Sequence, residues 1–158
     1  MAIRVSLLLS FALITGLCIG TVAQASSNPA SRHLDNLVGT WRCSYRMGGS
    51  TRSTTSVGTR LNDNWIELKG ATGDTLVTYD ATRKQWVQFS TNAQGYYNFS
   101  TANEAPTAKT LTWHTHYPAD MNTSVATISW VGTAKRVINA GREDRGKIIR
   151  TSGVCTKT

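Results

Sequence analysis

Hydrophobic and polar residues alternate along most of the chain beyond residue 37. The run over residues 37–47 shows this best, because Trp41, Cys43, Tyr45 and Met47 fall on one face of an extended strand and polar residues fall on the other. No later stretch keeps a helical period of about 3.6 residues, and turn residues recur at short intervals. The pattern therefore predicts an all-β protein.

Turn residues divide the rest of the chain into short strand-like runs over residues 51–61, 65–69, 75–79, 84–91, 96–102, 109–117, 123–131, 134–139 and 146–157. Eight to ten strands in sequence-local order favour an antiparallel up-and-down barrel over a Greek-key sandwich, which needs long crossovers. A short helical turn is predicted before the first strand, over residues 31–37, with Leu34 and Leu37 on one face. Residues 141–146 are predicted to form a charged hairpin tip.

Side-chain alternation also predicts which face of each strand points inward. For the run over residues 51–61, alternation predicts an inner face of Thr55, Val57, Thr59 and Leu61. Arg52 and Arg60 are predicted to face outward. This assignment decides which residues could contact a molecule inside the barrel.

The first 25 residues are typical of a secretory signal peptide. Arg4 supplies the positive start, an apolar stretch covers residues 5–19, and Ala23-Gln24-Ala25 is a cleavage site with small residues. A transmembrane helix is the alternative, but the apolar stretch is shorter than the ~20 residues it needs. We expect an exported protein, periplasmic or secreted, with a single domain over residues 26–158. Loss of Arg4 leaves 16 of the 17 basic residues against 9 acidic ones, a net charge of +7.

Two cysteines remain after the expected cleavage, Cys43 in the first strand and Cys155 in the last. In an exported protein such a pair predicts one disulfide bond, although two free buried thiols stay an alternative. A bond between the first and last strands would make them neighbours, as a sheet closed into a barrel requires. The cysteines therefore support the barrel prediction.

The segment Leu37-Val38-Gly39-Thr40-Trp41 resembles the opening motif of lipocalins and related calycin barrels. The resemblance implies that the helical turn plugs one end of the barrel and that Trp41 packs over it. It also implies that an arginine near the end of the chain stacks on Trp41. Arg150 is the first candidate by order and Arg136 the second.

Further along, Val77-Thr78-Tyr79-Asp80, the aromatic pair Trp86 and Phe89, and the segment over residues 109–113 extend the resemblance to small lipocalin-like bacterial proteins of unassigned function. The resemblance implies an interior cavity and no established reaction. Related haem-binding barrels continue with Gly-x-Gly after the Trp and carry a late histidine. This chain has Arg42-Cys43-Ser44 there and no histidine beyond His116. We expect no cofactor.

The interior of a barrel of this size is wide enough for one small ligand. Apolar and aromatic walls suit a compact apolar or amphipathic molecule, bound without turnover. The candidate ligand-binding residues are Tyr45, Val57, Trp65, Tyr79, Trp86, Tyr97, Trp113 and Trp130. The alternative is that the same aromatic residues fill the core.

His114 and His116 lie two residues apart on a strand and share one face, so they could bind a metal ion or haem. The competing interpretation places Leu111, Trp113 and Tyr117 inside and both histidines on a solvated outer face. No third ligand recurs at a diagnostic spacing.

Catalysis has no clear template in this chain. There is no Gly-x-Ser-x-Gly nucleophile motif, and both mature cysteines are assigned to the disulfide. Glu67 and Asp80 are conceivable as a carboxylate pair, but most of the acidic residues occupy turns, where they are ordinarily solvated.

The positive charge is spread along the chain in the pairs Arg42 with Arg46, Arg52 with Arg60, and Lys135 with Arg136. These pairs could form a basic outer face that contacts the anionic cell envelope, which is the rival function if the barrel is filled. Nucleic acid is a poor fit, because no recognition motif is present. We expect a monomer.

Overall fold

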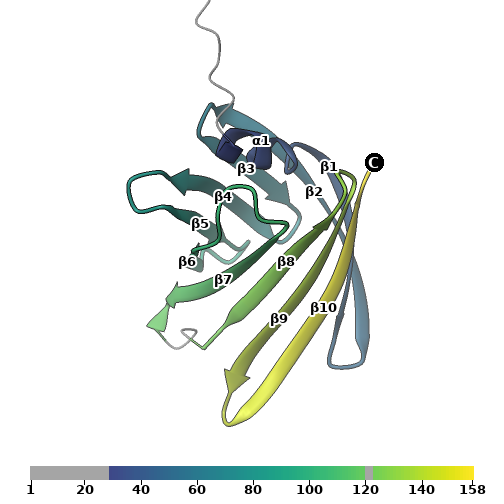
Figure 1. Cartoon of the computed structure of the whole chain (residues 1–158). Coiled ribbons are helices and arrows are strands. Elements are labelled where there is room, and N and C mark those ends of the chain that lie inside the picture. The colour runs from purple at the N-terminus through teal and green to yellow at the C-terminus, as the bar shows by residue number, and fades with distance from the viewer. Residues whose placement is uncertain (1–28, 120–122) are drawn as a thin grey trace, which may run out of the picture.

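The computed structural model describes residues 29–119 and 123–158. The expected signal peptide over residues 1–25 lies outside the described residues. Within the described residues, one short helix precedes ten strands (Figure 1). The elements are α1 (Pro29–Asp35), β1 (Gly39–Met47), β2 (Ser50–Asn62), β3 (Trp65–Gly70), β4 (Gly73–Asp80), β5 (Gln85–Thr91), β6 (Tyr97–Ala102), β7 (Thr110–Tyr117), β8 (Val125–Val131), β9 (Lys135–Asp144) and β10 (Lys147–Lys157).

The strands form one closed antiparallel barrel in which each strand pairs with its sequence neighbours and β10 returns to pair with β1. The predicted all-β up-and-down barrel is confirmed, with ten strands. The short helix before the first strand, which the sequence also predicted, is present in this barrel. Among the described residues, no helix has the length and apolar character that a membrane crossing requires.

The closing seam of the barrel is the pairing of β1 with β10. Cys43 lies directly opposite Cys155 in this register, and the two residues form a disulfide bond with a Cα–Cα distance of 4.0 Å. The bond spans a sequence separation of 112 residues. By the chain-entropy argument, a crosslink that closes so long a loop stabilises the fold by about 4–5 kcal/mol. The disulfide prediction is confirmed.

The helix α1 closes one end of the barrel (Figure 1). Leu34 is 1% exposed and belongs to the main core, and Trp41 is fully buried. The indole N–H of Trp41 donates a hydrogen bond to the Leu37 carbonyl oxygen at 3.0 Å, which ties the first strand to the segment after the helix. The predicted plug is confirmed, although the helix begins at Pro29 rather than at Ser31. Proline is favoured in the first turn because its missing N–H needs no partner there.

The arginine that stacks on Trp41 is Arg136 of β9, and the first candidate, Arg150, is wrong. The guanidinium carbon of Arg136 lies 4.5 Å from the centre of the Trp41 ring, and the Lys157 ammonium lies 5.4 Å from it. Arg150 is exposed on β10 and alternates to the outer side. Register explains the difference, because Cys155 faces inward and Arg136 is its cross-strand partner.

The predicted inner face of β2 is wrong. Trp41 pairs with Ser56 and Gly39 with Gly58, so small residues share the inner side with the bulky Trp41. A side chain at Gly58 would collide with the Leu37 carbonyl oxygen. Because the Trp41 ring and the segment after α1 already fill this space, the larger residues of β2 face outward. The outward set is Thr55, Val57, Thr59 and Leu61, whereas Arg52 and Arg60 alternate to the inner side.

A second difference concerns the hairpin between β9 and β10. Strand β9 continues to Asp144, and the turn is reduced to Arg145 and Gly146, both with positive φ. The predicted tip over residues 141–146 is therefore too long. Gly141 does not end the strand, because it pairs with Arg150 on one side and Val125 on the other.

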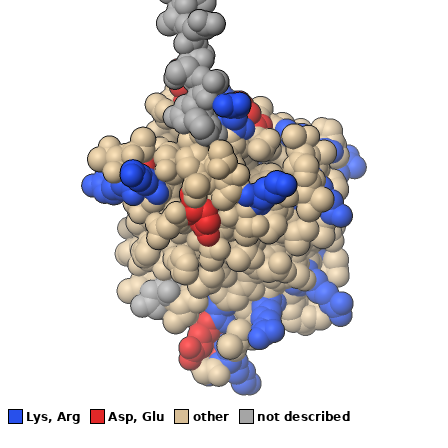
Figure 2. All heavy atoms as spheres, in the orientation of Figure 1, with Lys and Arg blue, Asp and Glu red and all other residues tan. Residues whose placement is uncertain are grey.

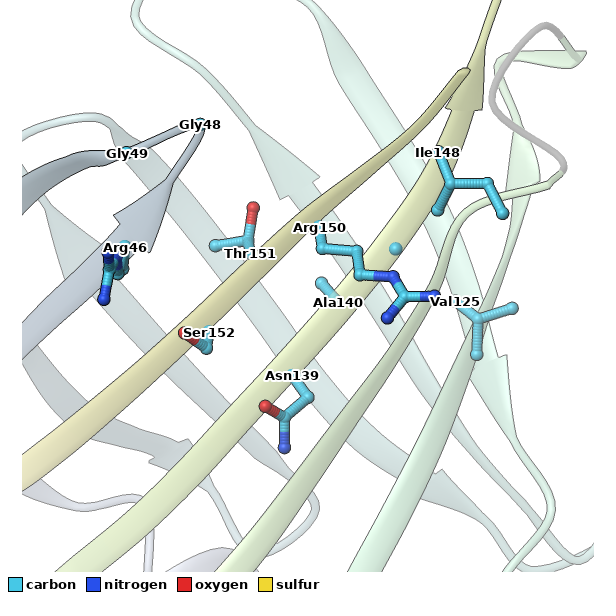
Figure 3. Close-up of a pocket in the computed structure, with 11 residues that line it drawn as sticks. Arg46, Gly48, Gly49, Val125, Asn139, Ala140, Ile148, Arg150, Thr151 and Ser152 are labelled. Carbon is cyan, nitrogen blue, oxygen red and sulfur yellow. The ribbon is translucent and has the colours of Figure 1, made fainter. Parts of the chain in front are cut away.

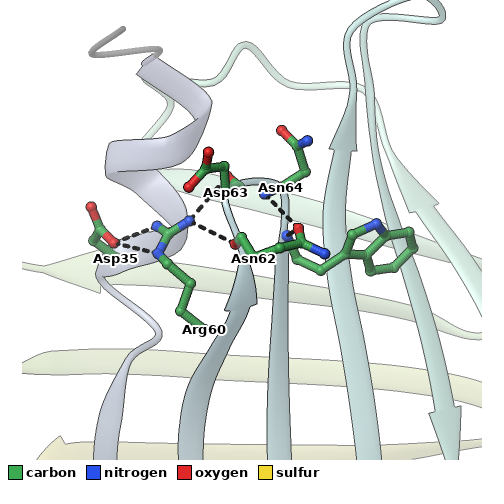
Figure 4. Close-up of polar contacts among 6 residues, drawn as sticks. Asp35, Arg60, Asn62, Asp63 and Asn64 are labelled. Atoms are coloured by element: carbon green, nitrogen blue, oxygen red, sulfur yellow. Dashed lines mark hydrogen bonds and ion pairs between the residues drawn. The ribbon is translucent and has the colours of Figure 1, made fainter. Parts of the chain in front are cut away.

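A polar cluster fastens α1 to the barrel (Figure 4). The Arg60 guanidinium forms an ion pair with Asp35 and donates to the carbonyl oxygens of Asn62 and Asp63 at 3.3 and 3.0 Å. The Asn62 side chain accepts the backbone N–H groups of Asn64 and Trp65. The Asp35 side chain is 58% exposed, so solvent limits the ion pair to at most about 1 kcal/mol. The main effect of the cluster is therefore to fix the position of α1 on the barrel, and its contribution to the free energy of unfolding is small.

Candidate functional site

The barrel interior is divided into a packed closed end and a more open end. The closed end, beneath α1, holds the main core of Ala30, Leu34, Leu37, Ile66, Val77, Trp86, Ala102, Leu111, Trp113 and Trp130. A cavity of only about 30 Å³ remains within it. The core-filling alternative for the aromatic residues is therefore correct at this end.

Five of the eight candidate ligand-binding residues lie inside the barrel. Tyr79, Trp86, Trp113 and Trp130 pack in or against the closed-end core. Tyr45 packs beside the disulfide, where its hydroxyl lies 3.8 Å from the Cys155 sulfur and burial raises the pKa of its phenol. These residues are inward, as predicted, but they leave little room beside them.

The other three candidates lie on the outer surface, so their predicted inward placement is wrong. Val57 is 45% exposed and Tyr97 is 54% exposed. Ile66 and its cross-strand partner Val77 belong to the core. Because side chains alternate along a strand, the preceding residue, Trp65, points outward. Tyr97 instead stacks on Tyr117 at 4.7 Å between ring centres. Each error follows from strand register, which shifts every side chain to the opposite face when it slips by one residue.

Hydroxyl and amide side chains line the barrel between the two ends. The hydroxyl oxygens of Thr75 and Ser90 form a hydrogen bond at 2.9 Å, and the Gln88 amide nitrogen donates to the Ser90 hydroxyl oxygen at 3.1 Å. On β6 and β7, the hydroxyl oxygens of Ser100 and Thr115 form a hydrogen bond at 3.2 Å. These residues satisfy one another and form a polar belt above the apolar core.

Beyond the polar belt lies a cavity of about 200 Å³ at the open end, which we call the mouth cavity. Its lining is Met47, Thr115, Ser124, Val125, Ala126, Ala140, Gly141, Arg142, Ile149 and Thr151. The residues come from β1, β7, β8, β9 and β10, together with the segment just before β8. Apolar and hydroxyl-bearing side chains therefore share this cavity, unlike the closed end.

Two polar groups of the mouth cavity have no partner among the described residues. The Ser124 hydroxyl is buried and forms no hydrogen bond. Arg142 lies directly opposite Ile149 in the β9–β10 register, so it shares the inner side with Ile149. It forms no ion pair with a described residue. A cation and an unused hydroxyl beside apolar walls form a lining that suits an amphipathic molecule with an anionic or hydrogen-bonding head.

A second, shallower depression lies on the outside of the barrel and has a volume of about 650 Å³. Figure 3 shows Arg46, Asn139, Ile148, Arg150 and Ser152 around it. We call it the outer groove. Neither arginine forms an ion pair within the described part of the chain.

The predicted basic outer face is only partly correct. Arg42 and Arg46 are exposed on β1 and alternate outward, as expected. Arg136, in contrast, is 5% exposed and lies inside the barrel. With Arg52 and Arg60 on the inner side of β2, the exterior keeps fewer cations than the sequence suggested. Figure 2 shows basic side chains dispersed among neutral ones on one face rather than gathered together.

His114 and His116 both lie exposed on the outer side of β7. His116 contacts the Thr101 hydroxyl at 2.7 Å and packs against Phe99. Within residues 29–119 and 123–158, no three His, Cys, Asp or Glu side chains gather as metal ligands. The predicted outer placement of both histidines is confirmed, but the predicted inward placement of Tyr117 is wrong, because Tyr117 is 45% exposed and stacks on the outer residue Tyr97.

The two carboxylates considered for catalysis take separate structural roles. Glu67 forms an ion pair with Lys69 at 3.3 Å. Asp80 accepts the backbone N–H groups of Thr82 and Arg83 and pairs with the Arg83 side chain. The hydrogen bonds from Arg83 lower the pKa of Asp80, so it stays ionised in its turn.

The candidate list from the sequence did not include the mouth cavity. Most of its lining residues are alanine, threonine, serine and glycine, which carry no distinctive signal in a sequence. One signal was available. Because Cys155 faces inward, alternation along β10 also places Thr151 and Ile149 inward.

No protein-family model and no curated protein sequence matches this chain. Among solved structures, the barrel is similar to the S-type phycobiliprotein lyase CPES from Guillardia theta, at 14% identity and a TM-score of 0.47, over 80% of this chain and 90% of that chain. It is also similar to the redesigned β-barrel mFAP1 bound to DFHBI, at 18% identity and a TM-score of 0.40, over 80% and 99%. A third similar structure is the siderocalin Ex-FABP, at 8% identity and a TM-score of 0.38, over 78% and 71%. These likenesses concern the fold.

Proposed function

We propose that this protein binds a compact amphipathic molecule in the mouth cavity, without chemical turnover. The observation that carries the proposal is one cavity that combines an apolar wall with Arg142 and the Ser124 hydroxyl, neither of which has a partner among residues 29–119 and 123–158. Met47, Ala126 and Ile149 would contact the apolar part of the ligand. An anionic head would pair with Arg142.

The size of the cavity restricts the ligand. About 200 Å³ is below the ~300–1,000 Å³ of pockets that enclose drug-sized ligands. The ligand is therefore compact, or it is a longer molecule with one end inserted and the other in solvent. A short-chain or medium-chain carboxylic acid has the required chemistry.

The test uses 8-anilinonaphthalene-1-sulfonate, whose fluorescence rises in an apolar site, and its displacement by decanoate. A Thr151→Trp variant fills the mouth cavity, and an Arg142→Gln variant removes its cation. We expect Arg142→Gln to weaken binding about tenfold or more, since a hydrogen bond to a charged group contributes ~1.5–3 kcal/mol. We expect Thr151→Trp to weaken binding as well, because the indole ring occupies the space that the ligand needs. Arg150→Gln removes a cation from the outer face and is the matched control. Unchanged affinity in both mouth variants would rule the proposal out.

A second candidate function is suggested by the outer groove, where Arg46 and Arg150 present charge on the exterior that no described residue pairs. There the protein would contact an anionic polymer or surface of the cell envelope. Salt-sensitive retention on dextran sulfate that disappears in an Arg46→Gln/Arg150→Gln variant would favour this candidate. Retention that the double variant leaves unchanged would exclude it.

We further propose that binding takes place after export, in the periplasm or outside the cell, and that the protein acts as a monomer. The signal-like sequence of residues 1–25 and the Cys43–Cys155 disulfide support export. Mass measurement of protein purified from the exporting host tests it, with Ser26 expected as the first residue. An intact chain beginning at Met1 would contradict it.

A further inference from the structure

Four buried nitrogen atoms at the closed end have no hydrogen-bond partner among the described residues. They are the indole Nε1 atoms of Trp113 and Trp130, Nε of Arg136 and Nε2 of His33. Each of the four residues is more than nine-tenths buried, with exposures of 5%, 9%, 5% and 7%. Buried polar groups are ordinarily paired, because an unpaired one lowers the stability of the folded state. Four in one small core call for a common explanation.

The four residues lie around one small space. All of them line the cavity of about 30 Å³ at the closed end. Trp130 and Arg136 are direct cross-strand partners, and the His33 ring lies 4.4 Å from the Trp130 ring. A single water-sized probe needs ~10–15 Å³, so this cavity has room for one monatomic ion or one or two water molecules.

The charge around the cavity is positive. Among the described residues, Arg136 forms neither an ion pair nor a side-chain hydrogen bond, and its guanidinium contacts the face of Trp41. Burial lowers the pKa of Arg136, while the nearby Tyr45 opposes that shift. A buried charge without a counter-charge is among the costliest arrangements in a protein core. A negative charge in the cavity would relieve it.

The chemistry of the four nitrogen atoms favours an ion over water. Indole and guanidinium N–H groups only donate, so Trp113, Trp130 and Arg136 all require an acceptor. A water molecule has two acceptor positions and must place its own two protons. The His33 nitrogen can serve as donor or acceptor according to its protonation. A halide ion accepts from every direction and donates nothing.

We propose that the closed-end cavity binds a small monovalent anion of halide size, held by the N–H groups of Trp113 and Trp130 and by the charge of Arg136. The anion acts as a structural counter-ion within the core. This site is separate from the mouth cavity, and neither proposal depends on the other.

The experiment follows thermal unfolding of the native protein as sodium chloride replaces sodium gluconate at constant ionic strength. Gluconate is too large for the cavity, so only chloride can stabilise the folded state through this site. We expect the midpoint to rise by several degrees and then to saturate. An Arg136→Met variant should lose this response, whereas Arg150→Met on the outer face should keep it.

A second pair of measurements covers the case in which Arg136→Met fails to fold. Trp113→Phe keeps the ring and removes only the N–H group, and it should weaken the chloride response several-fold. Crystals grown in sodium bromide should show an anomalous peak within hydrogen-bonding distance of both indole nitrogens. Equal midpoints in chloride and gluconate, or a cavity that holds water without an anomalous peak, would overturn the proposal.

Discussion

The two ends of the barrel are built from different residue types, although the same strands run through both. At the closed end, Trp41, Trp86 and Ile66 are fully buried and α1 covers them. At the open end, Met47 is 46% exposed and the lining consists mainly of small and hydroxyl-bearing residues. The comparison indicates that stability is concentrated at one end, which leaves the other end free to bind.

Strand lengths explain how this difference arises. The strands β1, β2, β9 and β10 have 9, 13, 10 and 11 residues, whereas β3 and β6 have 6 each. The long hairpins extend past the short strands at the open end (Figure 1). Residues on these extensions face neighbours on fewer sides, so they bury less apolar area and contribute less to stability.

The sharpest test of the comparison is the loss of one large side chain at each end. Trp86→Ala removes a fully buried ring and should lower the free energy of unfolding by ~3–5 kcal/mol. Ile148→Ala, at a position 67% exposed near the open end, should change it by at most about 0.5 kcal/mol. Urea unfolding followed by circular dichroism measures both. Similar losses in the two variants would contradict the comparison.

A smaller effect is expected from adding one methyl group at each end. Gly58→Ala should destabilise the protein by ~1–3 kcal/mol, because the new carbon meets the Leu37 carbonyl oxygen. Gly141→Ala is the matched variant, since a Cβ there has no atom within 4 Å and its φ is not positive. It should be neutral or stabilising by up to about 1 kcal/mol, through the unfolded chain. If Gly58→Ala proved as stable as the native protein, the closed end would be less tightly packed than described.

The smallest expected effect is a pH dependence that arises at the closed end. Burial lowers the pKa of His33 below its ordinary value of about 6.5, and a contact with the Pro106 backbone opposes that shift. The unfolded chain then takes up the proton first. The contribution of His33 to the free energy of unfolding should therefore be complete above pH ~6.5. It should decrease as the pH falls toward the lowered pKa of His33.

His33→Gln should flatten this part of the pH profile, measured by urea unfolding at several pH values in gluconate buffer. His114→Gln, on the exposed outer face of β7, is the control and should keep the native slope. An unchanged slope in His33→Gln would show that another group is responsible.

Most of the architecture could be predicted from the sequence because alternation and turn residues are local signals. The positions of the strands follow from such signals. The Cys43–Cys155 bond was predicted from the number of cysteines and the expected export, and the plug beneath Trp41 from the family resemblance. The inner face of β2 could not be predicted, since its inward residues Ser56 and Gly58 are small only because distant groups fill the space. The mouth cavity depends on the relative lengths of several strands, which no single segment of sequence reports.

The described chain begins and ends on the same side of the molecule. Helix α1 lies at the closed end, and the backbone N–H of Thr158 donates to the Thr40 carbonyl oxygen at 3.0 Å at the start of β1 (Figure 1). A tether or solid support joined to the carboxyl terminus would therefore attach to the closed end of the barrel and leave the open end facing away from it. Its rim would point into solution, and attachment would not obstruct the entry of a solute.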